Sequence, residues 1–267
     1  MAGADSKVTF SMPTRAILRG VPDTFDRAIS SKAPKPAIDV KRARIQHQAI
    51  VEQLDMYGVD MIHVPSDPAL PDCPFVEDCC VSVGGTLLVT ASAVESRRGE
   101  AAGVVAAAGA SALRVERMEP PAALDGGDVL TIGDVLYVGL SSRTNEAGVA
   151  ALERLAAREG KRVVRVKLRD GVLHLKSAVT AARPGLLVAV KGAFDAAPFG
   201  SVEFCWVEER DRLGANVLPI GSWIFVTSSA PRVEDELRHR GCSTVQCEIT
   251  EFEKADGGLS CLVVPLS

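Results

Sequence analysis

One pattern recurs along the chain and constrains the fold more strongly than any other feature. Five segments each contain two short runs rich in β-branched residues, as β-hairpins do. Four are continuous and turn at a pair of residues that includes glycine: residues 75–90 at Gly84-Gly85, 124–140 at Gly133-Asp134, 173–190 at Pro184-Gly185 and 215–227 at Gly221-Ser222. The fifth is divided between residues 14–19 and 259–266. Pairing of these two halves would close a ring of five units.

Helical patterns lie between the hairpins. Residues 39–57, 94–108, 144–159 and 231–240 carry apolar side chains at helical spacing, and each pattern has a glycine at its end: Gly58, Gly109, Gly160 and Gly241. Asp39 is the expected N-cap of the first helix, and the third is expected to start after Thr144. Residues 193–200 predict only a single turn. One unit every roughly 40–50 residues is typical of closed circular arrays.

The repeat therefore predicts an α/β fold, a five-bladed pseudo-symmetric α/β propeller. We expect one catalytic domain over residues 1–267, built from ββαβ repeats around a central active-site cavity. A mixed α/β sheet without rotational symmetry is the alternative. Aromatic residues make up only 4% of the chain, so Val, Leu, Ile and Ala must build the core.

Charge and cysteine content exclude several classes of partner. The net charge of −4 argues against a nucleic acid or an anionic membrane surface. No run of about 18 apolar residues and no signal peptide is evident, which favours a cytoplasmic protein. Seven cysteines, an odd number without a C-x-x-C pair, predict free thiols rather than a zinc site. We expect no metal and no cofactor.

Residues that carry chemistry recur where the hairpins open. Glu77 and Asp78 open the first, Asp125 and Asp128 the second, His174 the third, and Cys261 the last. Strand ends gathered around an axis of rotation would bring these side chains to one pocket. A cysteine, a histidine and an acid in one pocket predict a nucleophile, an acid–base partner and a group that orients the histidine.

The individual residues leave alternatives open. Cys261 follows two glycines that let the backbone approach a ligand, although a cysteine near a strand is often an inert core residue. Either Asp125 or Asp128 could orient His174, which is expected on a strand between two leucines.

Glu77 and Asp78 are adjacent on an extended run, so their side chains should diverge, with one facing the cavity. A carboxylate there suits a guanidinium, whose N–H groups match it in pairs. A guanidinium is also a cation, which favours the thiolate form of a nearby cysteine. Arg97 and Arg143 lie near expected helix starts, where they could bind a substrate carboxylate or form surface salt bridges.

At these residues the sequence resembles the dimethylarginine dimethylaminohydrolase family. The matching motifs, in family order, are Leu70-Pro71-Asp72-Cys73, Phe75-Val76-Glu77-Asp78, Ser96-Arg97-Arg98, Leu124-Asp125-Gly126-Gly127-Asp128, Gly139-Leu140-Ser141 with Arg143-Thr144-Asn145, Leu173-His174-Leu175-Lys176-Ser177, and Asp256-Gly257 with Cys261. The last motif departs from the family at Gly258 and Ser260, and residues 195–211 carry no family motif.

The resemblance implies the five-fold propeller of the guanidine-modifying enzymes and a hydrolase that converts asymmetric dimethylarginine and monomethylarginine to citrulline and an alkylamine. It implies Cys261 as nucleophile, His174 as acid and base, and Asp125 as the acid that orients the histidine. It implies a substrate-binding set made up of Val21, Asp72, Phe75, Glu77, Asp78, Arg97, Arg143, Ser177 and Asp256. The partner is then a small methylated arginine, and the chain is a possible homodimer.

Three other functions compete with this hypothesis. An arginine or other guanidine deiminase on the same fold is the nearest, although such enzymes are generally longer. A ring-shaped binding protein would keep the pocket without turnover. A zinc protein would use Cys261, His174 and an acid as ligands.

Overall fold

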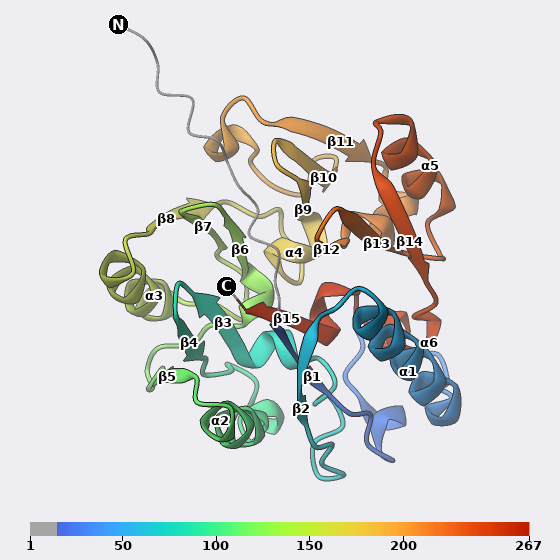
Figure 1. Cartoon of the computed structure of the whole chain (residues 1–267). Coiled ribbons are helices and arrows are strands. Elements are labelled where there is room, and N and C mark those ends of the chain that lie inside the picture. The colour runs from blue at the N-terminus through green and yellow to red at the C-terminus, as the bar shows by residue number, and fades with distance from the viewer. Residues whose placement is uncertain (1–14, 267) are drawn as a thin grey trace, which may run out of the picture.

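The computed structural model describes residues 15–266, in which five three-stranded sheets surround a common axis (Figure 1). In each sheet the middle strand pairs antiparallel with the first strand and parallel with the third. The structure therefore confirms the predicted five-bladed α/β propeller, and the alternative prediction, a mixed sheet without rotational symmetry, is wrong.

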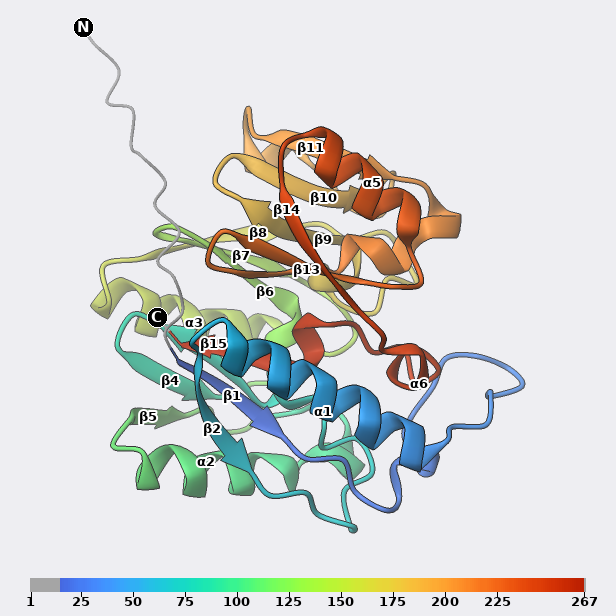
Figure 2. The ribbon, with the colours of Figure 1, turned by 45° about the vertical axis from the view of Figure 1, so that its right-hand side comes forward.

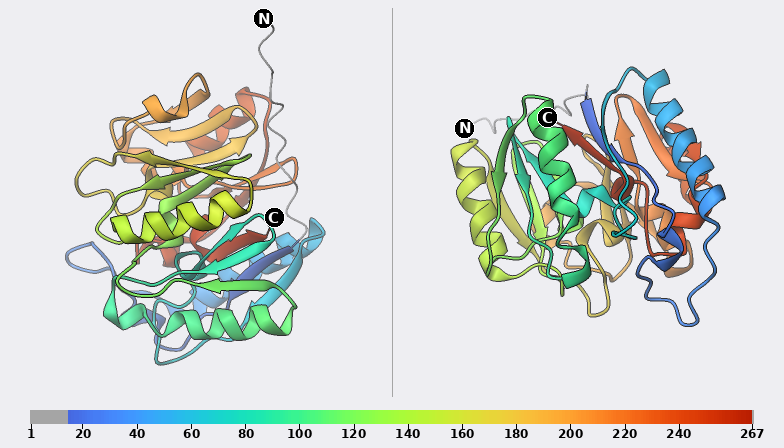
Figure 3. Two further views of the ribbon diagram at one scale, coloured as in Figure 1. Left: turned by 90° about the vertical axis from the view of Figure 1, so that its left-hand side faces the viewer. Right: turned by 90° about the horizontal axis from the view of Figure 1, so that it is seen from below.

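The strands and helices of the blades follow in chain order. The strands are β1 Arg15–Arg19, β2 Asp60–Val64, β3 Cys80–Val83, β4 Thr86–Val89, β5 Arg114–Arg117, β6 Val129–Ile132, β7 Val135–Gly139, β8 Arg162–Val166, β9 Val179–Arg183, β10 Leu186–Val190, β11 Glu203–Val207, β12 Leu218–Ile220, β13 Trp223–Thr227, β14 Ser243–Cys247 and β15 Val263–Leu266. The helices are α1 Val40–Met56, α2 Glu100–Ala110, α3 Glu146–Arg158, α4 Leu175–Ala178, α5 Pro231–His239 and α6 Thr250–Glu253. Helices α1, α2, α3 and α5 lie on the outer side of the ring (Figures 1 and 3).

The two ends of the described chain meet in one blade, as the split repeat predicts. Strand β1 pairs antiparallel with β15, from Arg15 opposite Leu266 to Leu18 opposite Val263. It pairs parallel with β2 on its other side, so that it lies between the two (Figure 2). Residue Thr14, at the edge of the expected strand, lies outside the described residues.

Most of the expected helix boundaries are confirmed, but both ends of α2 and the cap of α3 need correction. Asp39 caps α1, and its side chain accepts hydrogen bonds from the amides of Lys41 and Arg42. Helix α2 starts later than expected, because a separate 3-10 turn (Glu95–Arg97) precedes it, and it runs past Gly109 to Ala110. The helix reaches Gly109 without a break because that glycine keeps an ordinary helical backbone, whereas Gly160 and Gly241 end their helices at positive φ.

The cap of α3 is Asn145 rather than Thr144, because the Asn145 side chain accepts from the amide of Gly148.

The blade of β9, β10 and β11 has no outer α-helix. Its β10–β11 connection contains only the single turn Ala197–Phe199, as the weak pattern predicts. Aromatic rings fill part of the space: Phe199 stacks on Tyr137 with centroids 4.2 Å apart, and Phe204 stacks on Trp206 at 4.5 Å. Elsewhere the core consists mainly of aliphatic side chains packed between the blades.

A short helical turn precedes the first strand of every blade. The turns are η2 Val76–Cys79, η4 Gly126–Asp128, α4 Leu175–Ala178, η6 Glu209–Ala215 and η7 Ser260–Leu262. The acids, the histidine and the cysteine expected where the hairpins open lie on these turns or directly beside them. The expected placement of Glu77, Asp78 and His174 on strands is therefore wrong. A run of three or four residues is too short to show helical periodicity in a sequence.

No helix of residues 15–266 is long and apolar enough to span a membrane.

Candidate active site

The five turns form a closed ring around the axis. Turn η2 contacts both η7 and η4, and α4 contacts both η4 and η6. Asn216, directly after η6, completes the ring by hydrogen bonding to Ser260 of η7. Residues separated by tens of positions in the sequence are therefore held together by backbone that is packed on both sides.

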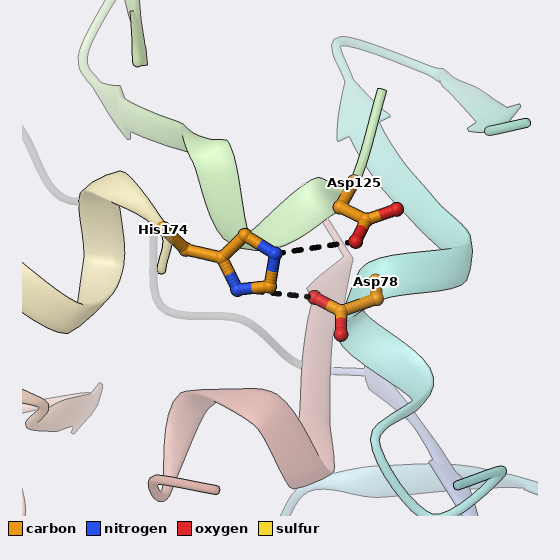
Figure 4. Close-up of side chains that lie close together, drawn as sticks. All are labelled: Asp78, Asp125 and His174. Atoms are coloured by element: carbon orange, nitrogen blue, oxygen red, sulfur yellow. Dashed lines mark hydrogen bonds and ion pairs between the residues drawn. The ribbon is translucent and has the colours of Figure 1, made fainter. Parts of the chain in front are cut away.

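His174 lies between two carboxylates (Figure 4). Its Nε2 atom is 3.2 Å from Asp125 Oδ2, and its Nδ1 atom is 3.8 Å from Asp78 Oδ1. All three side chains are buried. Burial alone lowers the pKa of His174, but Asp78 and Asp125, with help from Asp128, outweigh it and raise the pKa to about 9. The imidazole is therefore protonated at neutral pH and can donate a proton.

The structure distinguishes the roles of the two aspartates in the second motif. Asp125 contacts the imidazole ring. Asp128 instead accepts hydrogen bonds from the hydroxyls of Ser141 and Thr144 and from the amide of Leu175. Asp128 thus fixes the backbone directly after His174, while Asp125 holds its side chain.

The pair Gly126-Gly127 allows these groups to approach each other. A methyl group added at Gly127 would lie 2.7 Å from His174 Nδ1 and 2.9 Å from Asp78 Oδ1. One added at Gly126 would lie 2.0 Å from the carbonyl oxygen of Glu77. Only glycine fits between the acid-bearing turn and the histidine.

Asp78 is ionised and has one free oxygen. Its Oδ2 atom accepts from Arg97 Nη1 at 2.6 Å, whereas its Oδ1 atom has no hydrogen-bond partner among the described residues. Burial would raise the pKa of Asp78, but His174 and Arg97 outweigh it and hold the pKa below its usual value. A buried acceptor without a donor leaves room for a ligand that donates hydrogen bonds.

Arg97 is fully engaged by protein groups. Besides Asp78, its guanidinium binds Glu100 Oε2 at 2.8 Å and the carbonyl oxygen of Phe75 at 3.3 Å. Arg143 is half-buried, and its Nη1 atom lies 3.5 Å from Asp125 Oδ2. In this structure both arginines contact the site's carboxylates, so their predicted role towards a substrate carboxylate stays a prediction.

Cys261 lies on η7, and its Sγ atom accepts from the amide of Gly258 at 3.3 Å. Its side chain is partly exposed, unlike most of the other cysteines. Burial of the sulfur raises the pKa of the thiol, and the carboxylates of Glu77 and Asp78 raise it further. The resting thiol is therefore protonated at neutral pH, and a cation beside it would favour the thiolate.

Three other predicted binding residues lie around the connection between β1 and α1. Asp72 accepts from the amide of Ile29 at 2.9 Å, and Asp256 accepts from the amide of Ser31 at 2.5 Å. Val21 is buried at the start of the same connection. These contacts tie the connection to the segments that carry the first and last motifs.

Two more predicted binding residues occupy different surroundings. The Phe75 ring packs in an aromatic cluster with Phe25 and Phe252, and Gly257 lies against its edge. Ser177 is half-buried on α4, three residues after His174.

Sequence reasoning missed a polar network behind the nucleophile. Glu77 binds Lys176 Nζ at 2.5 Å through Oε1 and the hydroxyl of Ser260 at 2.8 Å through Oε2. Asn216, which lies between η6 and β12, also belongs to this network. The repeat register could have located Asn216, because it stands just before β12, at the opening of the one hairpin for which no polar residue was singled out.

Comparison with known proteins agrees with this arrangement. A family model described as eukaryotic N,N-dimethylarginine dimethylhydrolase matches residues 21–195. A dimethylarginine dimethylaminohydrolase of Streptomyces coelicolor is 37% identical over 257 residues, which cover 96% of this chain and 98% of that protein. The chain belongs to the dimethylarginine dimethylaminohydrolase family.

Solved structures place the family fold on this chain. The Pseudomonas aeruginosa dimethylarginine dimethylaminohydrolase, crystallised as a cysteine-to-serine variant with citrulline, superimposes with a TM-score of 0.88 at 25% identity, over 96% of this chain and 99% of that one. The N-terminal domain of a cyanobacterial arginine dihydrolase shares the fold at 20% identity and a TM-score of 0.84, over 95% of this chain and 97% of that one.

The dimethylarginine dimethylaminohydrolase site also has one group of side chains with the donor set of a metal site. Asp78, Asp125 and His174 can each offer a ligand atom, and these atoms lie within 4.8 Å of one another. Cys261 is not part of this group. The zinc ligands considered from the sequence, with Cys261 among them, therefore differ from the set that the structure brings together.

Proposed function

We propose that this chain hydrolyses Nω-methylated arginines, asymmetric dimethylarginine and monomethylarginine, to citrulline and an alkylamine through a covalent adduct on Cys261. The observation that carries the proposal is the Oδ1 atom of Asp78, a buried and ionised acceptor that receives no hydrogen bond from the described residues and lies 3.8 Å from His174 Nδ1. A guanidinium presents planar N–H donors and a positive charge, which match such an acceptor.

The substrate cation also explains how a protonated thiol becomes reactive. Burial and two carboxylates stabilise the neutral form of Cys261 in the empty site. A guanidinium bound to Asp78 brings a positive charge close to the sulfur and lowers the free energy of the thiolate. The thiol proton leaves to solvent, so the nucleophile forms where its target is bound.

The thiolate of Cys261 then attacks the central guanidinium carbon. Protonated His174 donates its proton to the departing alkylamine, and the C–N bond breaks to leave a thiouronium on the sulfur. Neutral His174 next takes a proton from water, whose oxygen adds to the same carbon. The C–S bond breaks with its electron pair returning to the sulfur, which takes up the hydroxyl proton of the intermediate, so that citrulline is released and the Cys261 thiol is restored. Asp125 stabilises the imidazolium and keeps the ring oriented through both steps.

The covalent step is tested by mass spectrometry of the protein mixed with asymmetric dimethylarginine and quenched in acid. We expect an adduct on the peptide that contains Cys261, and no citrulline release from Cys261→Ser. Citrulline release by Cys261→Ser at the wild-type rate would refute the assignment of the nucleophile.

The second candidate function is an arginine deiminase that releases ammonia. The observation that supports this second candidate is the fold that the chain shares with the cyanobacterial arginine dihydrolase domain. Measurement of kcat/KM for asymmetric dimethylarginine, monomethylarginine and arginine separates the two. A clear preference for arginine would overturn the choice of substrate.

The remaining expectations stay predictions. These are the cytoplasmic location, tested by cell fractionation, and the homodimer, tested by light scattering of the purified protein.

A further inference from the structure

The amide side chain of Asn216 connects the turn of the nucleophile with the turn of the histidine. Its Nδ2 atom donates to the carbonyl oxygen of Lys176 at 3.0 Å and to Ser260 Oγ at 2.9 Å. Its Oδ1 atom accepts from the amide of Ser260 at 2.8 Å. Lys176 follows His174 by two residues on α4, and Ser260 directly precedes Cys261 on η7. One amide thus holds backbone on both sides of the reaction centre.

Glu77 closes the same link from a third turn. It binds Lys176 Nζ through one oxygen and Ser260 Oγ through the other. Ser260 is therefore held by Asn216 through its amide and by both Asn216 and Glu77 through its hydroxyl. The backbone that carries Cys261 cannot shift along η7 without breaking these bonds.

Asn216 itself is rigidly placed. It is 7% exposed. The Thr180 hydroxyl donates to the carbonyl oxygen of Ala215 at 2.6 Å and accepts from the amide of Val217 at 3.0 Å, which fixes the backbone on either side. A methyl group added at Gly258 would lie 2.5 Å from Asn216 Cγ, so the loop before the nucleophile packs directly on the amide.

The chemistry of the link requires a side-chain amide. The position needs one acceptor, for the amide of Ser260, and two donors, for the carbonyl of Lys176 and the hydroxyl of Ser260. The planar side-chain amide of an asparagine supplies the acceptor and both donors. Aspartate would lose the donors and add a negative charge beside the network of Glu77. A leucine of similar volume would leave the buried Ser260 amide without an acceptor.

We propose that Asn216 is a positioning residue that sets the place of the Cys261 thiol relative to His174. This inference rests on the proposed function, in which those two groups act on one carbon atom. Asn216 touches no reacting atom, so its removal should alter turnover more than substrate binding. A displacement of about 1 Å at a reaction centre can lower a rate roughly 100-fold.

The test compares Asn216→Ala with Gln46→Ala. Gln46 is a matched control because it is equally buried, and its amide also makes two donor bonds, to Glu248 and Thr250, and accepts one backbone amide, that of Glu251. It joins α1 to the start of α6, and its three partners lie outside the catalytic turns, because α6 ends at Glu253 and η7 begins at Ser260. We expect both variants to lose similar thermal stability.

Only Asn216→Ala should change the chemistry. We expect its kcat for asymmetric dimethylarginine to fall about 10- to 100-fold, with KM changed by less than about threefold. The pH profile of Cys261 alkylation by iodoacetamide should also shift, because the thiol changes its distance from the surrounding charges. The proposal is overturned if kcat and the alkylation profile of Asn216→Ala match those of Gln46→Ala at equal loss of Tm.

A double-substitution cycle gives a second readout. If Asn216 acts through Ser260, then Ser260→Ala should lower kcat by less in the Asn216→Ala variant than in the wild-type protein. Fully additive effects of the two substitutions would argue against a role of Asn216 through Ser260. Alkylation needs no substrate, so it reports on Asn216 even if the wild-type protein turns over no methylated arginine. A wild-type protein that turns over no methylated arginine would refute the proposed function but not the positioning role of Asn216.

Discussion

Replacement of Gly127 by alanine tests how closely the acid-bearing turn and the histidine must approach. The added methyl group would lie 2.7 Å from His174 Nδ1 and 2.9 Å from Asp78 Oδ1. Ordinary contact requires about 3.5 Å, so the ring and the turn must separate by roughly 0.8 Å. The ring cannot retreat freely, because it is buried and held by Asp125. We expect kcat to fall about 10- to 100-fold, since a shift near 1 Å has that effect at a reaction centre.

The same change should destabilise the fold. Overpacking of a filled interior costs about 1–3 kcal/mol, and for a chain of this size each kcal/mol lowers Tm by roughly 2–4 °C. Citrulline release and scanning calorimetry measure the two effects.

Gly109→Ala is the matched control. Gly109 lies inside α2, and nothing lies within 4 Å of the methyl group added there. Alanine should stabilise this helix by about 0.5–1 kcal/mol and leave kcat unchanged. If Gly127→Ala kept wild-type kcat, the close approach would not be a requirement of the chemistry.

Two further predictions concern pH. The pKa of His174 is raised to about 9 in the folded state, above its unfolded value. The contribution of protonated His174 to stability is therefore complete below about pH 6.5 and is lost as the pH rises towards 9. The difference in Tm between the wild type and His174→Gln should narrow between these two pH values. Burial of His47 lowers its pKa to about 4, and its Nε2 atom has no partner in residues 15–266. Its unfolded form binds a proton first, so stability should fall from about pH 6.5 towards 4. His47→Gln should lose less stability over that range in acid unfolding, and an identical loss would contradict the assignment.

The sequence supports a prediction of the ring because its signals are local and repeated. Glycine turns between β-branched runs predict hairpins wherever they occur, and Gly84, Gly133, Gly185 and Gly221 all have positive φ as such turns require. The division of one unit between residues 14–19 and 259–266 similarly predicts closure. These features depend on neighbours in the chain, which a sequence displays directly.

The parts that could not be predicted depend on partners distant in the chain. Nothing local indicates that Arg97 would bind Asp78, or that Asn216 would reach Ser260. The helical turns that carry Glu77 and Asp78 have too few residues to show a period, so both residues were expected on a strand. Catalytic types such as cysteine and histidine stand out in a sequence, whereas an asparagine that orients them does not.

Closure of the ring by β1 and β15 also orders events during synthesis. The ribosome adds all strands of the other four blades before it adds Cys261, which lies two residues before the start of β15. A nascent chain therefore already carries Asp78, Asp125 and His174 while it still lacks the sulfur of Cys261. Strand β15 and Cys261 emerge together, so the chain acquires this thiol at the step that closes the ring.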